Sequence, residues 1–205
     1  MNAADGSDVK QLTFGDSFDA APDCSPDGNS IVYSSQTGEE TTLRKISVEG
    51  GEPIQLTDFE AVVPTFSPDG KFIACVLPSE SQIKPAELAI ISTDGGAPLK
   101  TFPVLQFAWN HRPARWTPSG DALVFYRNEK QVGNLWKQNI LGDRPVQLTD
   151  FKSDVILNHA FSRDGRRLII ARGKFHRRYS NVEKFYLLIF SSEARLLQGP
   201  FLKKR

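Results

Sequence analysis

The chain has 205 residues, 40% of them hydrophobic, and its 25 Lys and Arg residues nearly balance its 24 Asp and Glu residues. This length allows one large or two small domains, and the balanced charge excludes a global nucleic-acid or membrane-surface signature. No apolar run reaches the ~18 residues of a transmembrane helix. Residues 1–9 are polar, lack the pattern of a secretory signal, and are expected to be disordered.

The charge is unevenly distributed along the chain. Residues 151–205 contain 13 basic and 4 acidic residues, a net charge of +9, whereas the first 150 residues contain 12 basic and 20 acidic residues, a net charge of −8. No aromatic and basic recognition module accompanies the basic end. We therefore interpret it as a solvated basic surface and expect no nucleic-acid partner.

The ordered part is expected to begin with Lys10–Phe14. This segment, with its Gln-Leu-Thr sequence, matches Ile54–Asp58 and Val146–Asp150, and Pro98–Phe102 fills the same place with poorer agreement. The later copies each end a repeated unit. Residues 10–14 therefore resemble the last strand of a unit whose first three strands are not in this sequence.

A turn motif with apolar strands on both sides organises the chain. It occurs as Ser25-Pro26-Asp27-Gly28, Ser67-Pro68-Asp69-Gly70, Thr117-Pro118-Ser119-Gly120 and Ser162-Arg163-Asp164-Gly165, at spacings of 42, 50 and 45 residues. Proline presets one turn dihedral, Ser and Asp bond nearby amides, and Gly tolerates the positive dihedral. Each motif therefore predicts a β-hairpin, and the spacing indicates a repeat protein.

A third strand follows each of the first three hairpins, at Thr42–Ser47, Glu87–Ser92 and Asn134–Asn139, and a glycine turn leads from it to the closing strand. Four strands in ~40 to 50 residues match one propeller blade. We expect an all-β β-propeller spanning residues 10–202, with blades near residues 20–57, 62–102, 112–149 and 157–201 and a basic tail at 203–205.

Strands after the turns are apolar on both faces, which predicts blades stacked face to face. The residue before each turn is assigned to the buried class; these residues are Cys24, Phe66, Trp116 and Phe161. Cys24 and Cys75 fall in different blades at different core positions, so we expect buried free thiols and no disulfide.

The fourth unit departs from the pattern after Gly173. A basic loop, Lys174–Ser180, precedes a third strand expected at Phe185–Phe190, and a weak fourth strand is expected from Arg195–Leu197 and Gly199–Phe201.

The order Gln-Leu-Thr, Pro-x-Phe-Ser-Pro-Asp-Gly-Lys-x-Ile-Ala and Asp-Gly-Gly resembles the TolB-type, WD40-like β-propeller repeat over about residues 10 to 172. Residues 144–173 look most like the propellers attached to bacterial receptor-type serine/threonine kinases and winged-helix regulators. The resemblance implies a periplasmic or extracytoplasmic location. Such rings usually have six or more blades, so the four units are interpreted as part of a larger ring; the alternative is a closed four-bladed ring in which residues 10–14 pair with the last blade.

Catalytic and cofactor motifs are missing from the sequence. It contains no Gly-x-Ser-x-Gly elbow, phosphate loop or kinase signature, so we expect no enzyme activity and no cofactor. His111, His159 and His176 lack metal-ligand spacing, and the repeated Asp27, Asp69 and Asp164 are interpreted as turn formers.

Crossovers between blades gather at one mouth of a propeller channel. Residues placed there are candidates for a ligand site, against the alternative of solvated loop residues: Asp19, Glu60, His111, Arg112, Asn158 and His159. Trp116 is assigned to the core, which leaves Trp109 as the tryptophan with the best prospect of exposure.

Three functional hypotheses follow. The first is a non-catalytic recognition module that binds a protein segment or small ligand, such as the sensor part of a bacterial signalling protein. The second is the substrate-gating propeller of a serine peptidase whose hydrolase domain lies outside this sequence. The third is a fragment with no independent function. The first is preferred, with a protein or peptide partner expected and the oligomeric state left open.

Overall fold

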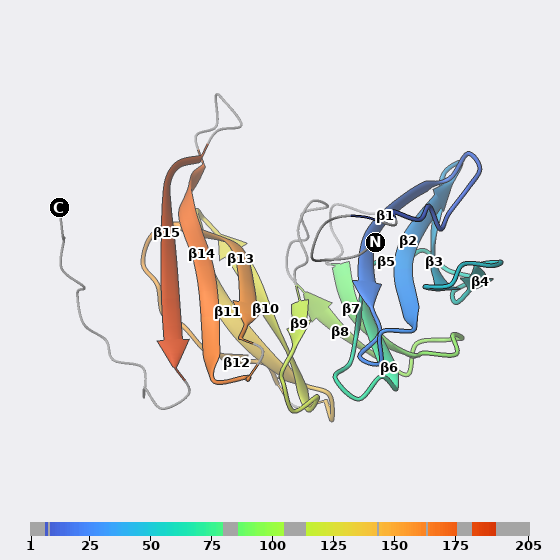
Figure 1. Cartoon of the computed structure of the whole chain (residues 1–205). Coiled ribbons are helices and arrows are strands. Elements are labelled where there is room, and N and C mark those ends of the chain that lie inside the picture. Colours follow the sequence, from blue (N-terminus) through green and yellow to red (C-terminus); the bar gives the residue numbers. More distant parts are fainter. Residues whose placement is uncertain are drawn as a thin grey trace. The chain divides into compact units, whose positions relative to one another are not determined.

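The computed structural model describes residues 7, 9–79, 86–104, 114–142, 144–162, 164–175 and 182–191, and the regular elements in these ranges are all β-strands. Four antiparallel sheets form, which confirms the predicted all-β fold of four blades (Figure 1). The chain divides into two compact units, residues 1–112 and 113–205, with two sheets in each. Within the described ranges no helix is suited to spanning a membrane.

The first unit contains two four-stranded sheets in which each strand pairs with the next along the chain. The first sheet consists of β1 (Phe18–Cys24), β2 (Ser30–Thr37), β3 (Glu40–Ser47) and β4 (Ile54–Gln55). The second consists of β5 (Val62–Phe66), β6 (Phe72–Leu77), β7 (Ala86–Ser92) and β8 (Lys100–Val104). The predicted third strands are confirmed here as β3 and β7.

The second unit contains one four-stranded and one three-stranded sheet. The first consists of β9 (Ala114–Trp116), β10 (Ala122–Glu129), β11 (Val132–Asn139) and β12 (Val146–Gln147). The second consists of β13 (Val155–Phe161), β14 (Arg167–Phe175) and β15 (Val182–Ser191). The third strand expected in the fourth unit is confirmed as β15, whereas Lys174 and Phe175 belong to β14 and not to a loop. The weak fourth strand expected after residue 194 lies outside the described residues.

The turn motif works through its serine and aspartate side chains. Ser25 Oγ donates to Asp27 Oδ1 at 2.5 Å and accepts from Ser30 N at 2.9 Å, while Gly28 N donates to Ser25 O at 2.9 Å. Gly28 has a φ of 77°, which glycine adopts without a steric cost. The serine hydroxyl lowers the pKa of the aspartate in this turn and in the turns that contain Asp69 and Asp164. The turn-forming role of these aspartates is thereby confirmed.

The third turn motif has no aspartate, and an aspartate that follows the motif takes its place. Asp121, which follows the turn glycine, accepts from Ser119 Oγ at 2.5 Å and from Thr117 Oγ1 at 2.6 Å. These two hydrogen bonds lower the pKa of Asp121 to about 2. The sequence motif alone did not indicate that Asp121 replaces the missing carboxylate.

The cores lie between the two sheets of each unit. In the first unit, Val32 and Leu43 of the first sheet pack in one buried cluster with Phe66, Ile73 and Cys75 of the second. In the second unit, a cluster of the same kind joins the two sheets; it contains Val124, Tyr126, Leu135, Ile156 and Ile170. Each cluster covers one face of the strands that follow the turns. The prediction that these strands are covered on both faces is confirmed for β2, β6 and β10, where consecutive residues are buried.

Cys24 is exposed, so its assignment to the buried class is wrong. Cys24 stands opposite Ile31 as Phe66 stands opposite Ile73, and Phe66 faces the first sheet. The equivalent position in the first sheet therefore faces away from the second sheet, where no described sheet of this unit covers it. Phe66 and Trp116 are buried as predicted, and Phe161 is half-buried against the second core.

The closing segments hold the third strands through a repeated set of hydrogen bonds. In the first sheet, Leu56 N donates to Leu43 O at 2.8 Å and Leu43 N donates to Thr57 Oγ1 at 3.0 Å. Gln55 Nε2 donates to Thr57 O at 2.9 Å, which orders the segment from within. The same three bonds recur between Gln147–Thr149 and Leu135. The Gln-Leu-Thr sequence is thus a clamp on the third-strand leucine.

Candidate functional site at the first strands

The first strands of the two sheets in the first unit run parallel, side by side. Val63 N donates to Ser34 Oγ at 2.9 Å, and Ser34 stands opposite Ala20 in the first sheet. Further along, Phe66 N donates to Asp23 Oδ2 at 2.8 Å. Because Val63 lies level with Ala20 and Phe66 contacts Asp23, β1 and β5 run in the same direction and begin at the same end of the unit.

Two acidic residues lie at that end. Asp19 is half-buried in β1, and its Oδ1 accepts from Ser35 Oγ at 2.7 Å. Glu60 is exposed and immediately precedes Ala61, whose N donates to Thr41 O at 3.0 Å. Thr41 stands opposite Gln36, which in turn stands opposite Phe18 at the start of β1. The structure therefore brings the predicted residues Asp19 and Glu60 to one end of the first unit.

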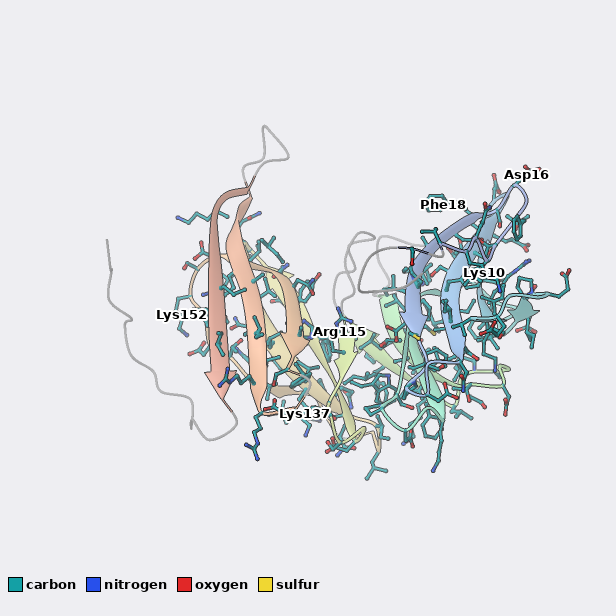
Figure 2. The ribbon with its side chains drawn as sticks, in the orientation of Figure 1. Lys10, Asp16, Phe18, Arg115, Lys137 and Lys152 are labelled. Carbon is teal, nitrogen blue, oxygen red and sulfur yellow. The ribbon has the colours of Figure 1, made fainter. Side chains whose placement is uncertain are left out.

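An exposed aromatic ring lies at the start of β1, next to Asp19 in the sequence. Phe18, the first residue of β1, is 69% exposed and projects from the strand (Figure 2). An end of the unit that has both carboxylates and an exposed ring suits a segment with cationic side chains, because carboxylates attract such side chains and a ring face can accommodate them. Sequence reasoning missed Phe18 because its exposure depends on the exact start of β1.

Backbone bulges shape the first strands. The pairing of β1 with β2 shifts between Ala20 and Asp23, and that of β5 with β6 shifts between Val62 and Thr65. Ala21 and Val63 lie inside these bulges with φ values of 52° and 54°, an uncommon conformation for alanine and a marked outlier for a β-branched residue. Bulges of this kind re-aim side chains along a strand. No residue type in the sequence signals them.

His159 lies inside β13, so its predicted place in a crossover between blades is wrong. Its side chain is buried, with Nε2 3.0 Å from Val124 O and the ring edge-on to Tyr126. Burial lowers the pKa of His159 to about 4, so the imidazole is neutral at pH 7. Its neighbour Asn158 is exposed in the same strand, and Asn158 Oδ1 accepts from His159 N at 2.8 Å.

The remaining predicted site residues, His111 and Arg112, lie outside the described residues, as does Trp109. Asp19 and Glu60 belong to the first unit, whereas Asn158 and His159 belong to the second. The described candidate is therefore the acidic end of β1 and β5 in the first unit, defined by Phe18, Asp19 and Glu60.

Arginine side chains stack on aromatic rings in the second unit. The Arg127 guanidinium lies 4.6 Å from the Trp136 ring centroid, and that of Arg172 lies 3.6 Å from the Phe151 centroid. Arg172 Nη2 also donates to Ser153 O. Burial lowers the pKa of both arginines. The Arg172 contacts join β14 to the crossover segment that leads into its own sheet, whereas Arg127 stacks on Trp136 between β10 and β11, and no sequence pattern indicated either role.

The described part of the chain contains no arrangement of side chains suited to thiol or metal chemistry. There, no group of three His, Cys, Asp or Glu side chains is placed to hold a metal ion. Cys24 and Cys75 are both free, as expected, and burial raises the pKa of Cys75 to about 12. Cys75 is thus a core residue.

No family model and no curated protein sequence matches this chain. Solved structures do match it. TolB from Acinetobacter baumannii gives a TM-score of 0.68 at 19% identity, over 92% of this chain and 44% of its own length. A putative TolB from Agrobacterium tumefaciens gives 0.57 at 20% identity, over 76% of this chain and 54% of its own. The β-propeller domain of the Trilobed protease from Pyrococcus furiosus gives 0.61 at 14% identity, over 86% and 55%.

These likenesses show a TolB-like β-propeller fold. At such low identities they carry the fold alone, so the predicted link to receptor kinases and winged-helix regulators stays a prediction. The chain spans about half, or less, of the length of each of these proteins. Its four sheets therefore match only part of each of these proteins.

Proposed function

We propose that this chain is a non-catalytic recognition module that binds a protein segment carrying Lys or Arg at the acidic end of β1 and β5. The observation that carries the proposal is the meeting of Asp19 and Glu60 at the same end of two parallel strands. Between them they offer two carboxylates at a surface with an exposed ring, Phe18. Clustered charge of one sign attracts and orients a segment of the opposite sign.

The carboxylates and the ring at this end of the first unit determine which kind of ligand it can bind. A lysine or arginine side chain can pair with a carboxylate at its charged end and lie along an aromatic ring with its stem or guanidinium plane. A small anionic ligand is disfavoured by the two carboxylates. A peptide segment also has free backbone groups for hydrogen bonding, which suits a surface made by the ends of strands.

The experiment is a selection of short random peptides displayed on phage against the whole chain. The expected outcome is enrichment of Lys and Arg, with affinity for the best peptide falling about tenfold in Asp19→Asn/Glu60→Gln, because two charge contacts together are worth about 1.4 kcal/mol. The matched control is Glu49→Gln/Asp94→Asn. These residues follow the third strands, at the opposite end of the unit. Equal losses in both double variants, or no enrichment of basic residues, would reject the proposal.

A second candidate function is the substrate-gating propeller of a peptidase. The likeness to the propeller domain of the Trilobed protease favours it. A gating role predicts that peptides are admitted with little regard to charge, so the same selection separates the two functions: basic enrichment lost in Asp19→Asn/Glu60→Gln supports recognition, and charge-independent binding supports gating.

A further inference from the structure

Four of the described turns have the sequence Ser-x-Asp-Gly. Three are the motif turns that contain Asp27, Asp69 and Asp164, and the fourth, Ser92-Thr93-Asp94-Gly95, follows β7. In all four, the glycine φ lies between 69° and 87° and the glycine N donates to the serine O at 2.9 to 3.0 Å. The main chain is therefore alike at these four Asp-Gly bonds, and their side chains can be compared directly. A fifth pair, Asp5-Gly6, lies outside the described residues.

The aspartate carboxylate is held in place in the three motif turns. In each of them, Oδ1 accepts from the serine Oγ at 2.5 to 2.6 Å and from the main-chain N of the residue after the glycine at 3.0 to 3.2 Å. The serine hydroxyl is the main cause of the lowered pKa of these aspartates, so their carboxylates stay ionised in mild acid. The turn thus fixes both the position and the charge of the group.

Asp94 lacks this arrangement although its turn has the same sequence pattern. Ser92 Oγ accepts from Asp94 N at 3.2 Å, whereas the motif serines donate to the aspartate Oδ1. Within the described residues the Asp94 carboxylate has no hydrogen-bond or ion-pair partner, and Asp94 is exposed. The pattern Ser-x-Asp-Gly therefore gives a held carboxylate three times and a free one once.

An Asp-Gly pair can react with itself when the glycine N attacks the aspartate Cγ, and the absence of a glycine side chain leaves the N open to this approach. A C–N bond forms, the carboxyl OH leaves as water with the amide proton, and a five-membered succinimide results. Water then opens the ring at either carbonyl, which gives aspartate or isoaspartate, so the water lost is regained and no other reactant is needed. The attack requires a protonated carboxyl group that is free to turn toward the glycine N, because the reacting atoms must first meet.

We propose that, of the four described pairs, Asp94-Gly95 is the one that converts to isoaspartate, and that the serine hydrogen bonds protect the other three. The corresponding turn of the first sheet, after β3, has glutamate in place of Asp94. There, Glu49 N donates to Ser47 Oγ at 3.1 Å and Gly50 N donates to Ser47 O at 2.9 Å. A glutamate would have to close a six-membered ring, which forms far more slowly. The chain thus builds the same turn once with a reactive residue and once with a resistant one.

Isoaspartate at residue 94 disturbs a contact between the two sheets of the first unit. The main chain then runs through the side-chain carbon atoms of this residue and is longer by one methylene group, about 1.5 Å. Gly95 has no room for such a shift, because a Cβ on it would lie 2.6 Å from Leu56 O. Its neighbour Gly96 donates its N–H to Leu56 O at 2.9 Å. The modification is therefore expected to break this hydrogen bond to the closing segment of the first sheet.

Ageing of the full chain for several weeks at pH 6 and 37 °C tests the proposal. Peptide mapping by mass spectrometry with electron-transfer fragmentation tells isoaspartate from aspartate. It is expected to find isoaspartate at residue 94 and about tenfold less at residues 27, 69 and 164, because each of these must first lose a charge-assisted hydrogen bond. Asp94→Glu, which copies Glu49, is expected to abolish the product at residue 94. Ser25→Ala frees the Asp27 carboxylate from its serine partner and is expected to raise the product at residue 27 about tenfold.

Three results would overturn the proposal. Equal isoaspartate at all four residues, or an unchanged yield at residue 27 in Ser25→Ala, would show that the serine bonds do not protect. Absence of the product from residue 94 would show that its turn prevents the attack. Ser162→Ala repeats the protection test in the second unit, should Ser25→Ala fail to fold.

Hydrogen exchange of Gly96 gives a second readout. It is expected to be faster in the aged chain than in the fresh one and unchanged by ageing in Asp94→Glu; equal exchange in an aged chain that contains isoaspartate would contradict the loss of the bond to Leu56 O. Asp94→Asn is expected to react faster, since ammonia leaves the amide readily. The Glu49→Gln/Asp94→Asn control of the peptide selection is therefore used freshly purified.

Discussion

Asn128 and Ile156 exchange two hydrogen bonds through the Asn128 amide. Asn128 Nδ2 donates to Ile156 O at 2.9 Å, and Ile156 N donates to Asn128 Oδ1 at 2.9 Å. The amide side chain thus bridges β10 and the main chain of β13, forming the pair of hydrogen bonds that a neighbouring strand would form. Gly133 leaves space for this pair, because a Cβ there would lie 2.2 Å from Asn128 Oδ1.

Removing this amide is expected to destabilise the second unit. Asn128→Ala leaves the N–H and C=O of the buried Ile156 without partners, which costs about 2 kcal/mol of unfolding free energy. Asn139→Ala is the control, since Asn139 Oδ1 accepts from Leu141 N in an exposed turn. Urea unfolding of both variants measures the difference; equal midpoints would show that the Asn128 bridge contributes nothing.

The two phenylalanines of the first unit are expected to respond differently to truncation. Phe66 belongs to the core cluster between the sheets, so Phe66→Ala should cost about 3 to 5 kcal/mol. Phe18 is largely exposed, and Phe18→Ala should change stability by less than about 0.5 kcal/mol. Small and similar losses in urea unfolding would contradict the face-to-face stacking of the sheets.

His159 makes the stability of the second unit dependent on pH. Its pKa is about 4 in the folded chain and near 6.5 when unfolded, so the unfolded state binds the proton first. Stability is complete above pH 6.5 and is lost as the pH falls toward 4. Between pH 7.5 and 5 the loss should be about 2 kcal/mol.

Urea unfolding at these two pH values measures the loss, with His159→Leu as the comparison. The variant should be less stable at pH 7.5 but should lack this component of the pH dependence. The aspartates of the turns titrate below their ordinary pKa of 3.8 and do not interfere at pH 5. Parallel pH dependence in both proteins would show that His159 is not held neutral.

The two thiols are expected to differ in reactivity. Cys24 is exposed, whereas burial raises the pKa of Cys75 to about 12 and shields its sulfur. A disulfide reagent at pH 8 should modify one thiol per native chain and two per chain in denaturant. Cys24→Ser should abolish the native reaction. Rapid modification of both thiols in the native chain would argue against the core position of Cys75.

Sequence reasoning succeeded where a residue pattern determines local structure. The Ser25 and Asp27 turn, the third strands and the two-faced apolar strands follow from side chains that act on their own neighbourhood. It failed where a neighbouring element decides the outcome. Cys24 has the register of Phe66 but faces away from the second sheet. His159 is buried because it packs between sheets, where its side chain contacts Val124 O and the Tyr126 ring.

The candidate site shows the same division. Asp19 and Glu60 were predictable from the rule that crossovers meet at one end of a blade. The bulges at Ala21 and Val63 were not, because neither residue favours a positive φ; contacts such as that of Val63 N with Ser34 Oγ hold the backbone there. The clamp by Thr57 on Leu43 was also missed, since a threonine in a closing segment resembles any solvated strand residue.

Hydrogen exchange along β11 tests most directly the central claim, that a Gln-Leu-Thr segment clamps the third-strand leucine of the first and third sheets. Mass spectrometry would follow the amides of residues 132–139 in the unaltered chain and in Thr149→Val, with residues 40–47 of the first unit as the reference. The amide of Leu135 is expected to exchange faster in Thr149→Val, because its acceptor Thr149 Oγ1 is removed, while the amides of residues 40–47 exchange as before. Equal exchange of residues 132–139 in both proteins would contradict the claim.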